Sequence, residues 1–131
     1  MVIDTSAVIA ILLGEPGADR LLGAVSAAPD RLMSSASLVE CGLVLQGRLG
    51  AGAESLVYAL CAAQEITILP LTTEQARMAI AAHSRFGRGS GSRARLNFGD
   101  CCTYALAKAT HQELLFVGDD FTHTDLNWAP W

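Results

Sequence analysis

The sequence predicts an α/β fold in which one parallel β-sheet is covered by helices on both faces. Short apolar runs alternate along the chain with longer helical stretches, and Gly, Pro or Asp residues separate them. Such alternation favours parallel strands that are buried between two layers of helices. The 131 residues are 51% hydrophobic, which is enough for a folded core, and no repeat or long linker divides them. We therefore expect a single domain spanning residues 1–131.

Four apolar runs are predicted strands, because each is short and is followed by polar or turn-forming residues. They cover residues 1–3, 31–33, 66–69 and 114–117. Helices are expected where Gly, Pro or a capping residue marks each end of a longer stretch. The predicted helices cover residues 6–13, 18–27, 38–48, 53–64, 73–86 and 100–109.

The net charge of −4 excludes a protein that attracts nucleic acid through its overall charge. A polyanion would have to be bound by a local basic patch or through metal ions. The longest apolar stretch, residues 7–13, is far shorter than the roughly 18–20 residues that a membrane span needs. Four cysteines without a C-x-x-C pair indicate buried thiols in the reducing cytoplasm.

Acidic residues occur where functional sites form in parallel sheets, which is just after strands and at the starts of helices. Asp4 follows the first strand, Glu40 and Asp100 lie near helix starts, and Asp119 and Asp120 follow the last strand. If they converge, carboxylates about 4 Å apart repel by roughly 4 kcal/mol in a partly shielded site, so either some of them are protonated or a cation binds among them. Oxygen ligands alone favour Mg²⁺ or Mn²⁺ over zinc.

Each acidic residue also has a purely structural interpretation. Asp4 fits an N-cap of the first helix, and Ser37 with Glu40 fits the S-x-x-E capping box. Asp100 fits either an N-cap or the third helical position paired with Asn97, and the last two acids fit a turn. Capping does not require acids to converge across a sheet, whereas metal binding does.

A Gly- and Ser-rich loop at residues 87–93 precedes the acidic residue at position 100. Four of the nine basic residues lie in or beside it: Arg85, Arg88, Arg93 and Arg95. Guanidinium groups match phosphate oxygens, so we predict that this segment binds the backbone of a nucleic acid. The alternative is a solvated loop with no ligand.

Four segments resemble, in order, the acidic elements of the PIN-domain family, and within it the VapC-type toxins of bacterial toxin–antitoxin pairs. They are residues 2–7 (VIDTSA), 37–40 (SLVE), 96–101 (LNFGDC) and 114–121 (LLFVGDDF). The resemblance implies a PIN-like α/β/α sandwich with a central, mostly parallel sheet. It also implies a Mg²⁺- or Mn²⁺-dependent endoribonuclease that cleaves cellular RNA, with tRNA or rRNA as the expected target, and thereby inhibits translation.

By the same resemblance, four carboxylates are the catalytic and metal-binding residues. They are Asp4, Glu40, Asp100 and Asp119, with Asp120 as a further candidate for the fourth position. Supporting hydrogen bonds are expected from Thr5, Ser6 and Asn97. The resemblance further implies a homodimer that binds a VapB-type antitoxin.

Two other classes of protein compete with the nuclease. A non-catalytic PIN-like module would hold a partner protein and would need no divalent ion. A receiver-type signalling domain also has an acidic Mg²⁺ pocket, but it needs a lysine after a late strand. The chain has one lysine, Lys108, and it lies inside a predicted helix. Binding of a divalent ion therefore separates the nuclease from the binding module.

Overall fold

A four-stranded parallel sheet forms the centre of the computed structural model, which describes residues 1–131. Its strands are β1 (Val2–Ile3), β2 (Leu32–Ser34), β3 (Thr67–Leu69) and β4 (Leu114–Leu115). Their order in the sheet is β3-β2-β1-β4. The chain moves outward from β1 to β3 and then returns to the other side of β1, so a topological switch point lies between β1 and β4. The predicted parallel α/β fold is confirmed.

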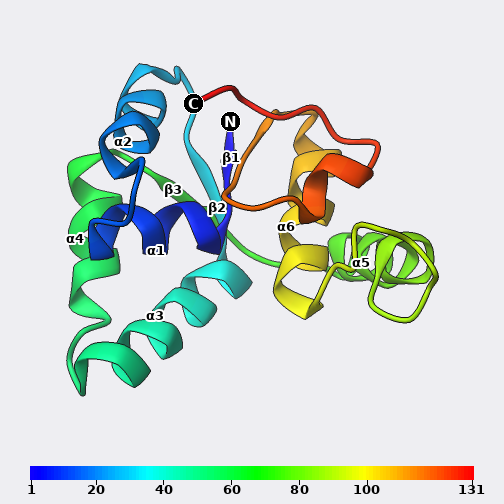
Figure 1. Ribbon diagram of the computed structural model, residues 1–131, viewed down its shortest axis with the longest axis horizontal. Helices are drawn as coiled ribbons and strands as arrows, with labels where there is room; N and C mark the ends of the chain where they lie inside the picture. Colours follow the sequence, from blue (N-terminus) through cyan, green and yellow to red (C-terminus); the bar gives the residue numbers. More distant parts are fainter.

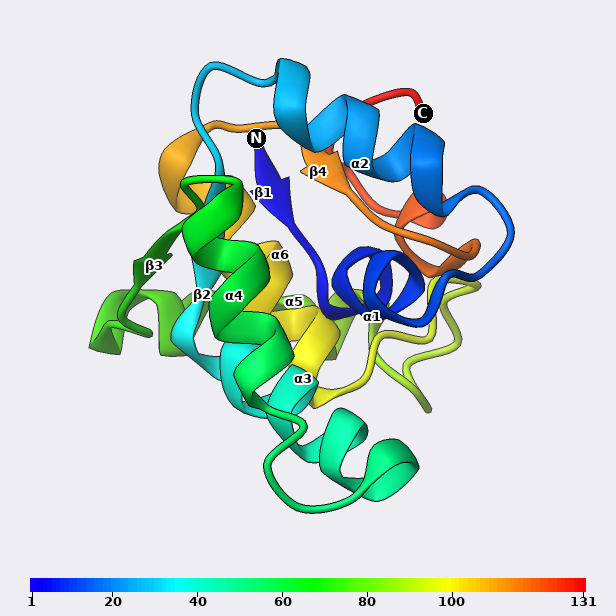
Figure 2. The ribbon, with the colours of Figure 1, turned by 90° about the vertical axis from the view of Figure 1, so that its left-hand side faces the viewer.

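Six α-helices and one short 3-10 helix, η1, surround the sheet (Figure 1). They are α1 (Thr5–Leu13), α2 (Ala18–Ala27), α3 (Ser35–Leu49), α4 (Ser55–Ala63), α5 (Thr73–Phe86), α6 (Phe98–Thr110) and η1 (Asp120–His123). Figure 2 shows α1, α2 and α4 on one face of the sheet, with α5 and α6 behind it. Helix α3 starts directly after β2 and packs against both α1 and α6. No helix combines the length and the hydropathy that a membrane-spanning segment requires.

The two faces of the sheet have separate apolar cores, because successive residues of a strand point to opposite sides. Val2 and Leu114 pack into the core beneath α5 and α6. Ile3 and Leu115 pack into the core beneath α1, α2, α3 and α4. None of these four side chains is exposed, so β1 and β4 are anchored from both faces. This anchoring holds the residues that follow β1 and β4 in place at the carboxyl edge of the sheet.

Helix α3 differs from its prediction in a way that changes the interpretation of its first turn. The helix begins at Ser35, three residues before the predicted start, and Ser34 is its N-cap. The Ser34 hydroxyl accepts a hydrogen bond from the Ala36 amide at 3.2 Å. Ser37 therefore lies inside the helix, and the prediction of a capping box formed by Ser37 and Glu40 is wrong.

The C-terminal tail folds back over the end of β4. The Trp131 indole donates a hydrogen bond to the Phe116 carbonyl at 2.9 Å, and the Trp128 ring meets Phe116 edge-on. Both tryptophans thus pack against the segment that follows β4, although each stays partly exposed. Figure 1 shows both termini at the amino edge of the sheet, opposite the starts of α1, α3 and α6.

Candidate active site

An acidic pocket of about 280 Å³ lies at the carboxyl edge of the sheet, beside the switch point between β1 and β4. Four of its lining residues are carboxylic acids, contributed by the end of β1, by α3, by α6 and by η1. The twelve lining residues are Asp4, Thr5, Ser6, Ile9, Glu40, Val44, Arg48, Asn97, Asp100, Val117, Asp120 and Phe121. The structure thus brings acids from distant parts of the chain to one place.

Asp4 serves the fold with one carboxylate oxygen and leaves the other free. It is the N-cap of α1, and its Oδ2 accepts hydrogen bonds from the Ser6 amide at 2.9 Å and the Ser6 hydroxyl at 2.6 Å. The Ser6 hydroxyl accepts in turn from the Val117 amide at 3.0 Å, which ties α1 to the segment after β4. Oδ1 of Asp4 is buried without a partner. A buried unpaired carboxylate oxygen is costly unless a ligand binds it.

Glu40 lies in the second turn of α3, and its carboxylate is held from two sides. The Thr5 hydroxyl donates a hydrogen bond to Oε2 of Glu40 at 2.7 Å. On the other side, the carboxylate lies so close to Gly99 in α6 that a Cβ at that position would overlap it. The absence of a side chain at Gly99 therefore allows the Glu40 carboxylate to reach the start of α6.

Asp100 and Asn97 form a reciprocal capping box at the start of α6. The Asn97 side chain accepts from the Asp100 amide at 2.9 Å, and Oδ2 of Asp100 accepts from the Asn97 amide at 2.7 Å. Burial raises the pKa of Asp100 to about 6, and the nearby charges of Asp4, Asp120 and Glu40 act in the same direction. The structural and functional interpretations of Asp100 are therefore compatible, as they are for Asp4.

Of the two acids that follow β4, only Asp120 lines the acidic pocket. Gly118 adopts a left-handed conformation with φ of +103°, and Asp119 is the residue that precedes η1. Asp120, the first residue of η1, raises the pKa of Asp100 through its charge. The sequence ranks Asp119 first for the fourth position, but the turn at Gly118 places the next residue, Asp120, at the pocket.

None of the four arginines around the loop at residues 87–93 lines the acidic pocket. Arg85 forms an ion pair with Asp125 at 3.5 Å and stacks over the Phe86 ring. The Arg88 guanidinium donates to the Arg95 carbonyl at 3.3 Å. The segment leads directly into Asn97, so the basic side chains lie near the pocket along the chain without entering it.

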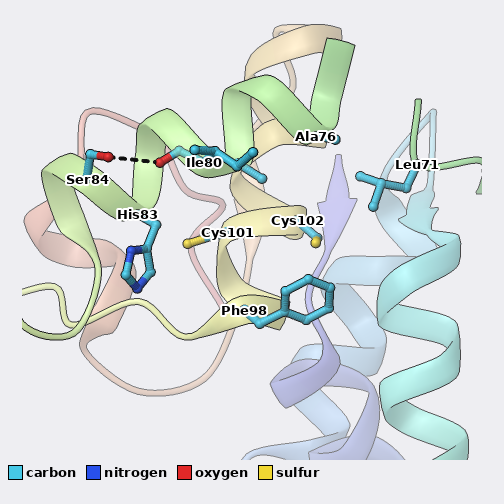
Figure 3. Close-up of a pocket in the computed structure, with 9 residues that line it drawn as sticks. Leu71, Ala76, Ile80, His83, Ser84, Phe98, Cys101 and Cys102 are labelled. Atoms are coloured by element: carbon cyan, nitrogen blue, oxygen red, sulfur yellow. Dashed lines mark hydrogen bonds between the residues drawn. The ribbon is translucent and has the colours of Figure 1, made fainter. Parts of the chain in front are cut away.

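A second and larger hollow, of about 500 Å³, lies between α5 and α6 and is mainly apolar (Figure 3). Leu71, Ile80 and Phe98 lie around it, and Cys101 and Cys102 reach it from α6. It contains none of the predicted catalytic residues. His83 is the one histidine at this hollow, and no histidine lines the acidic pocket.

The donor chemistry of the acidic pocket fits a divalent cation. Its four acidic side chains offer only oxygen atoms as donors, which suits Mg²⁺ or Mn²⁺. One of these atoms, Oδ1 of Asp4, has no hydrogen-bond partner. The carboxylates are nevertheless not closed around one point, since no three His, Cys, Asp or Glu side chains are grouped tightly enough to hold a metal ion. A bound cation would therefore have to draw these side chains inward.

Three features of the site are not predicted from the sequence. Arg48 lines the pocket, and its spacing of eight residues from Glu40 on one helix could have indicated this. A buried hydrogen bond of 3.0 Å joins the hydroxyls of Ser37 and Thr103, one turn from Glu40 and Asp100 respectively. The role of Gly99 depends on the approach of α3 to α6, for which the sequence contains no signal.

Comparison with known proteins identifies the family. Residues 1–127 match the family model described as the PIN domain. The chain belongs to the PIN-domain family. Ribonuclease VapC28 of Mycobacterium tuberculosis is 44% identical to this PIN-domain chain over 129 residues, which cover 98% of this chain and 97% of VapC28.

Solved structures show the same PIN-domain fold. The crystal structure of VapC20 of Mycobacterium tuberculosis, described as a Sarcin–Ricin loop cleaving toxin, has a TM-score of 0.76 at 16% identity and covers 95% of both chains. A chain from a toxin–antitoxin complex of Klebsiella pneumoniae has a TM-score of 0.72 at 18% identity, covering 99% of this chain and 97% of that one. At these identities the likeness concerns the fold alone.

Proposed function

We propose that this chain is a metal-dependent endoribonuclease and the toxin of a type II toxin–antitoxin pair. The observation that carries the proposal is the pocket at the switch point, where acids from four separate elements converge. The relationship to a VapC ribonuclease over nearly the whole chain supports the same reaction. The substrate would be a structured cellular RNA, either tRNA or rRNA, and its cleavage would inhibit translation.

In this proposal Asp4, Glu40, Asp100 and Asp120 hold Mg²⁺ or Mn²⁺. Asp120 takes the fourth position in preference to Asp119 because it lines the pocket. When bound, the ion supplies a Lewis acid for the phosphodiester and lowers the pKa of water.

The chain's own residues orient the carboxylates. Ser6 holds one oxygen of Asp4, Thr5 holds one oxygen of Glu40, and Asn97 holds one oxygen of Asp100. Each bond restrains one oxygen and leaves the other oxygen of the same carboxylate available. The sites are thus partly organised before any ligand arrives.

The arginine-rich segment is proposed to bind the RNA backbone. Arg88, Arg93 and Arg95 are exposed, whereas Arg85 is engaged with Asp125. Replacing Arg88, Arg93 and Arg95 together with Ala should weaken RNA binding and flatten its dependence on salt concentration, because fewer phosphate contacts release fewer counterions. Unchanged affinity and salt dependence in the triple variant would show that the segment is only a solvated loop.

The proposed partners are a second copy of the chain and a VapB-type antitoxin in the cytoplasm. Large apolar side chains are exposed on α3, α4, α5 and α6, and burying them against another protein would be favourable. The neighbour from Klebsiella pneumoniae was solved as a toxin–antitoxin complex, which supports an antitoxin partner. Light scattering of the purified chain measures its oligomeric state, and a monomer at all concentrations would contradict the homodimer.

Cleavage of total bacterial RNA tests the enzymatic proposal. The purified chain is incubated with Mg²⁺, with Mn²⁺ and with EDTA, and Asp4→Asn is the matched variant because an Asn side chain still caps a helix. We expect cuts at a few discrete sites, and we expect both EDTA and the variant to abolish them. Folded wild-type protein that cuts no RNA with either ion would instead favour the non-catalytic binding module, in line with the open arrangement of the acids.

A further inference from the structure

The acidic pocket contains one basic side chain, Arg48, which the proposed reaction leaves without a role. Glu40, Val44 and Arg48 are spaced by four residues along α3 and all line the pocket. This spacing places them on one stripe of the helix, so Arg48 shares a face with a proposed metal ligand. At 1.5 Å per residue, it lies roughly 12 Å along the helix axis from Glu40.

Arg48 is held by a single weak contact. One guanidinium nitrogen lies 3.4 Å from Oε1 of Glu15, in the turn between α1 and α2. The Arg48 and Glu15 side chains are 56% and 41% exposed, so water competes with the pair and screens it. Most of the N–H groups of the guanidinium have no partner in the protein. An incoming anion can therefore replace Glu15 at little cost.

A phosphate is the anion that this position suits. RNA must approach four carboxylates on a chain of net charge −4, so repulsion has to be offset close to the pocket. An arginine fork matches two phosphate oxygens and carries charge at any physiological pH. The roughly 12 Å between Arg48 and Glu40 along the helix axis suits a phosphate that flanks the scissile bond better than the scissile phosphate itself.

We propose that Arg48 is a positioning residue that exchanges its ion pair with Glu15 for a phosphate flanking the cleaved bond of RNA. The proposal rests on the proposed ribonuclease function and adds a binding contact to it. Arg48 would raise the affinity for RNA and align the strand, and it would take no part in the chemical step. Glu15 would keep the guanidinium at the rim of the pocket when no RNA is bound.

Binding of a short fluorescein-labelled oligouridylate, measured by anisotropy at several salt concentrations in EDTA, tests this contact without cleavage. The variants are Arg48→Gln, Glu15→Gln and Arg77→Gln. Arg77→Gln is the matched control, because Arg77 is exposed on α5, lies outside the pocket and loses the same charge. Cleavage kinetics of the same proteins with Mn²⁺ then show whether each substitution changes KM or kcat.

We expect Arg48→Gln to weaken binding by roughly tenfold and to lower the salt slope by about 1. KM should rise by a similar factor while kcat changes little. Glu15→Gln should bind RNA as tightly as the wild type or more tightly, and Arg77→Gln should bind like the wild type. An Arg48→Lys variant that binds RNA more tightly than Arg48→Gln would show that the positive charge matters.

Three results would overturn the proposal. Arg48→Gln could bind like Arg77→Gln, Glu15→Gln could lose as much affinity as Arg48→Gln, or the wild type could bind no oligouridylate. The second result would show a purely structural ion pair. Failure of the ribonuclease proposal is distinguishable, because it would appear as absent cleavage with Mn²⁺ while binding in EDTA still depended on Arg48.

Discussion

The acidic pocket and the apolar hollow are the two main cavities of this chain. They differ in volume and in the chemistry of the side chains that line them. The hollow is larger, at about 500 Å³ against about 280 Å³. Two of its polar groups are poorly reactive, because the Ser84 hydroxyl donates to the Ile80 carbonyl and burial raises the pKa of the Cys101 thiol to about 11. In the smaller pocket, by contrast, four carboxylic acids converge and one buried oxygen lacks a partner.

We infer that convergence of charge, rather than cavity volume, marks the proposed site of chemistry in this fold. Apolar walls can bind a partner by burial alone, but they cannot activate water or neutralise a phosphate. The acidic pocket can do both once a cation enters. If this distinction is right, small changes at the pocket should have large effects on cleavage, and changes at the hollow should have almost none.

Among substitutions that keep all four acids, the largest effect is expected from Gly99→Ala. The added methyl group overlaps the Glu40 carboxylate, which must swing away from its bond with Thr5. We expect RNA cleavage to fall by about a hundredfold, because displacement by about an ångström can have that effect. The fold should persist, since the clash involves the end of a flexible side chain and Ala favours a helix.

Gly47→Ala is the matched control for this substitution. Gly47 lies in α3 with open space around its Cβ position, so the change should preserve cleavage and raise the free energy of unfolding by about 0.5–1 kcal/mol. Equal cleavage by both variants would break the link between the approach of α3 to α6 and the geometry of the site.

The next effect distinguishes two neighbouring acids. Asp120→Asn should weaken binding of Mn²⁺ by roughly tenfold, because it removes one negative oxygen ligand from the pocket. Asp119→Asn removes the same charge one residue away and should leave the affinity nearly unchanged. Isothermal titration with Mn²⁺ measures both. A larger loss of Mn²⁺ affinity in Asp119→Asn than in Asp120→Asn would support Asp119 as the fourth metal ligand, as the sequence predicts.

A smaller effect is expected beneath the pocket, at the buried bond between Ser37 and Thr103. Replacing Ser37 by Ala leaves the Thr103 hydroxyl unpaired, which should lower the free energy of unfolding by about 1 kcal/mol. Thr103→Val should have a similar effect. The double variant should lose less than the sum, and denaturant unfolding of all four proteins completes the cycle. Additive losses would show that the two hydroxyls act independently.

The smallest effect is expected at the apolar hollow. Ile80 is 70% exposed, so Ile80→Gln should change the free energy of unfolding by less than about 0.5 kcal/mol. Cleavage of RNA and affinity for Mn²⁺ should match those of the wild type. A loss of Mn²⁺ binding in this variant would remove the distinction between the two cavities.

The general architecture is readable from the sequence because it depends on local patterns. The alternation of apolar runs and helical stretches predicts the parallel sheet, and the predicted 18–27 and 73–86 helices match α2 and α5. Predicted helix boundaries that depend on a capping residue differ more from those of the structure. Helix α3 starts at Ser35 because Ser34, rather than a residue nearer to Glu40, supplies the capping oxygen.

For this chain, the order of residues is sufficient to predict a parallel α/β domain and to place acids after strands and at helix starts, because those patterns follow from local periodicity and capping. The tertiary structure decides which acids meet. It places Asp120 at the pocket in place of Asp119, since the left-handed turn at Gly118 sets where η1 begins. It also brings Gly99 of α6 against the Glu40 carboxylate, because that contact depends on how α3 and α6 pack together.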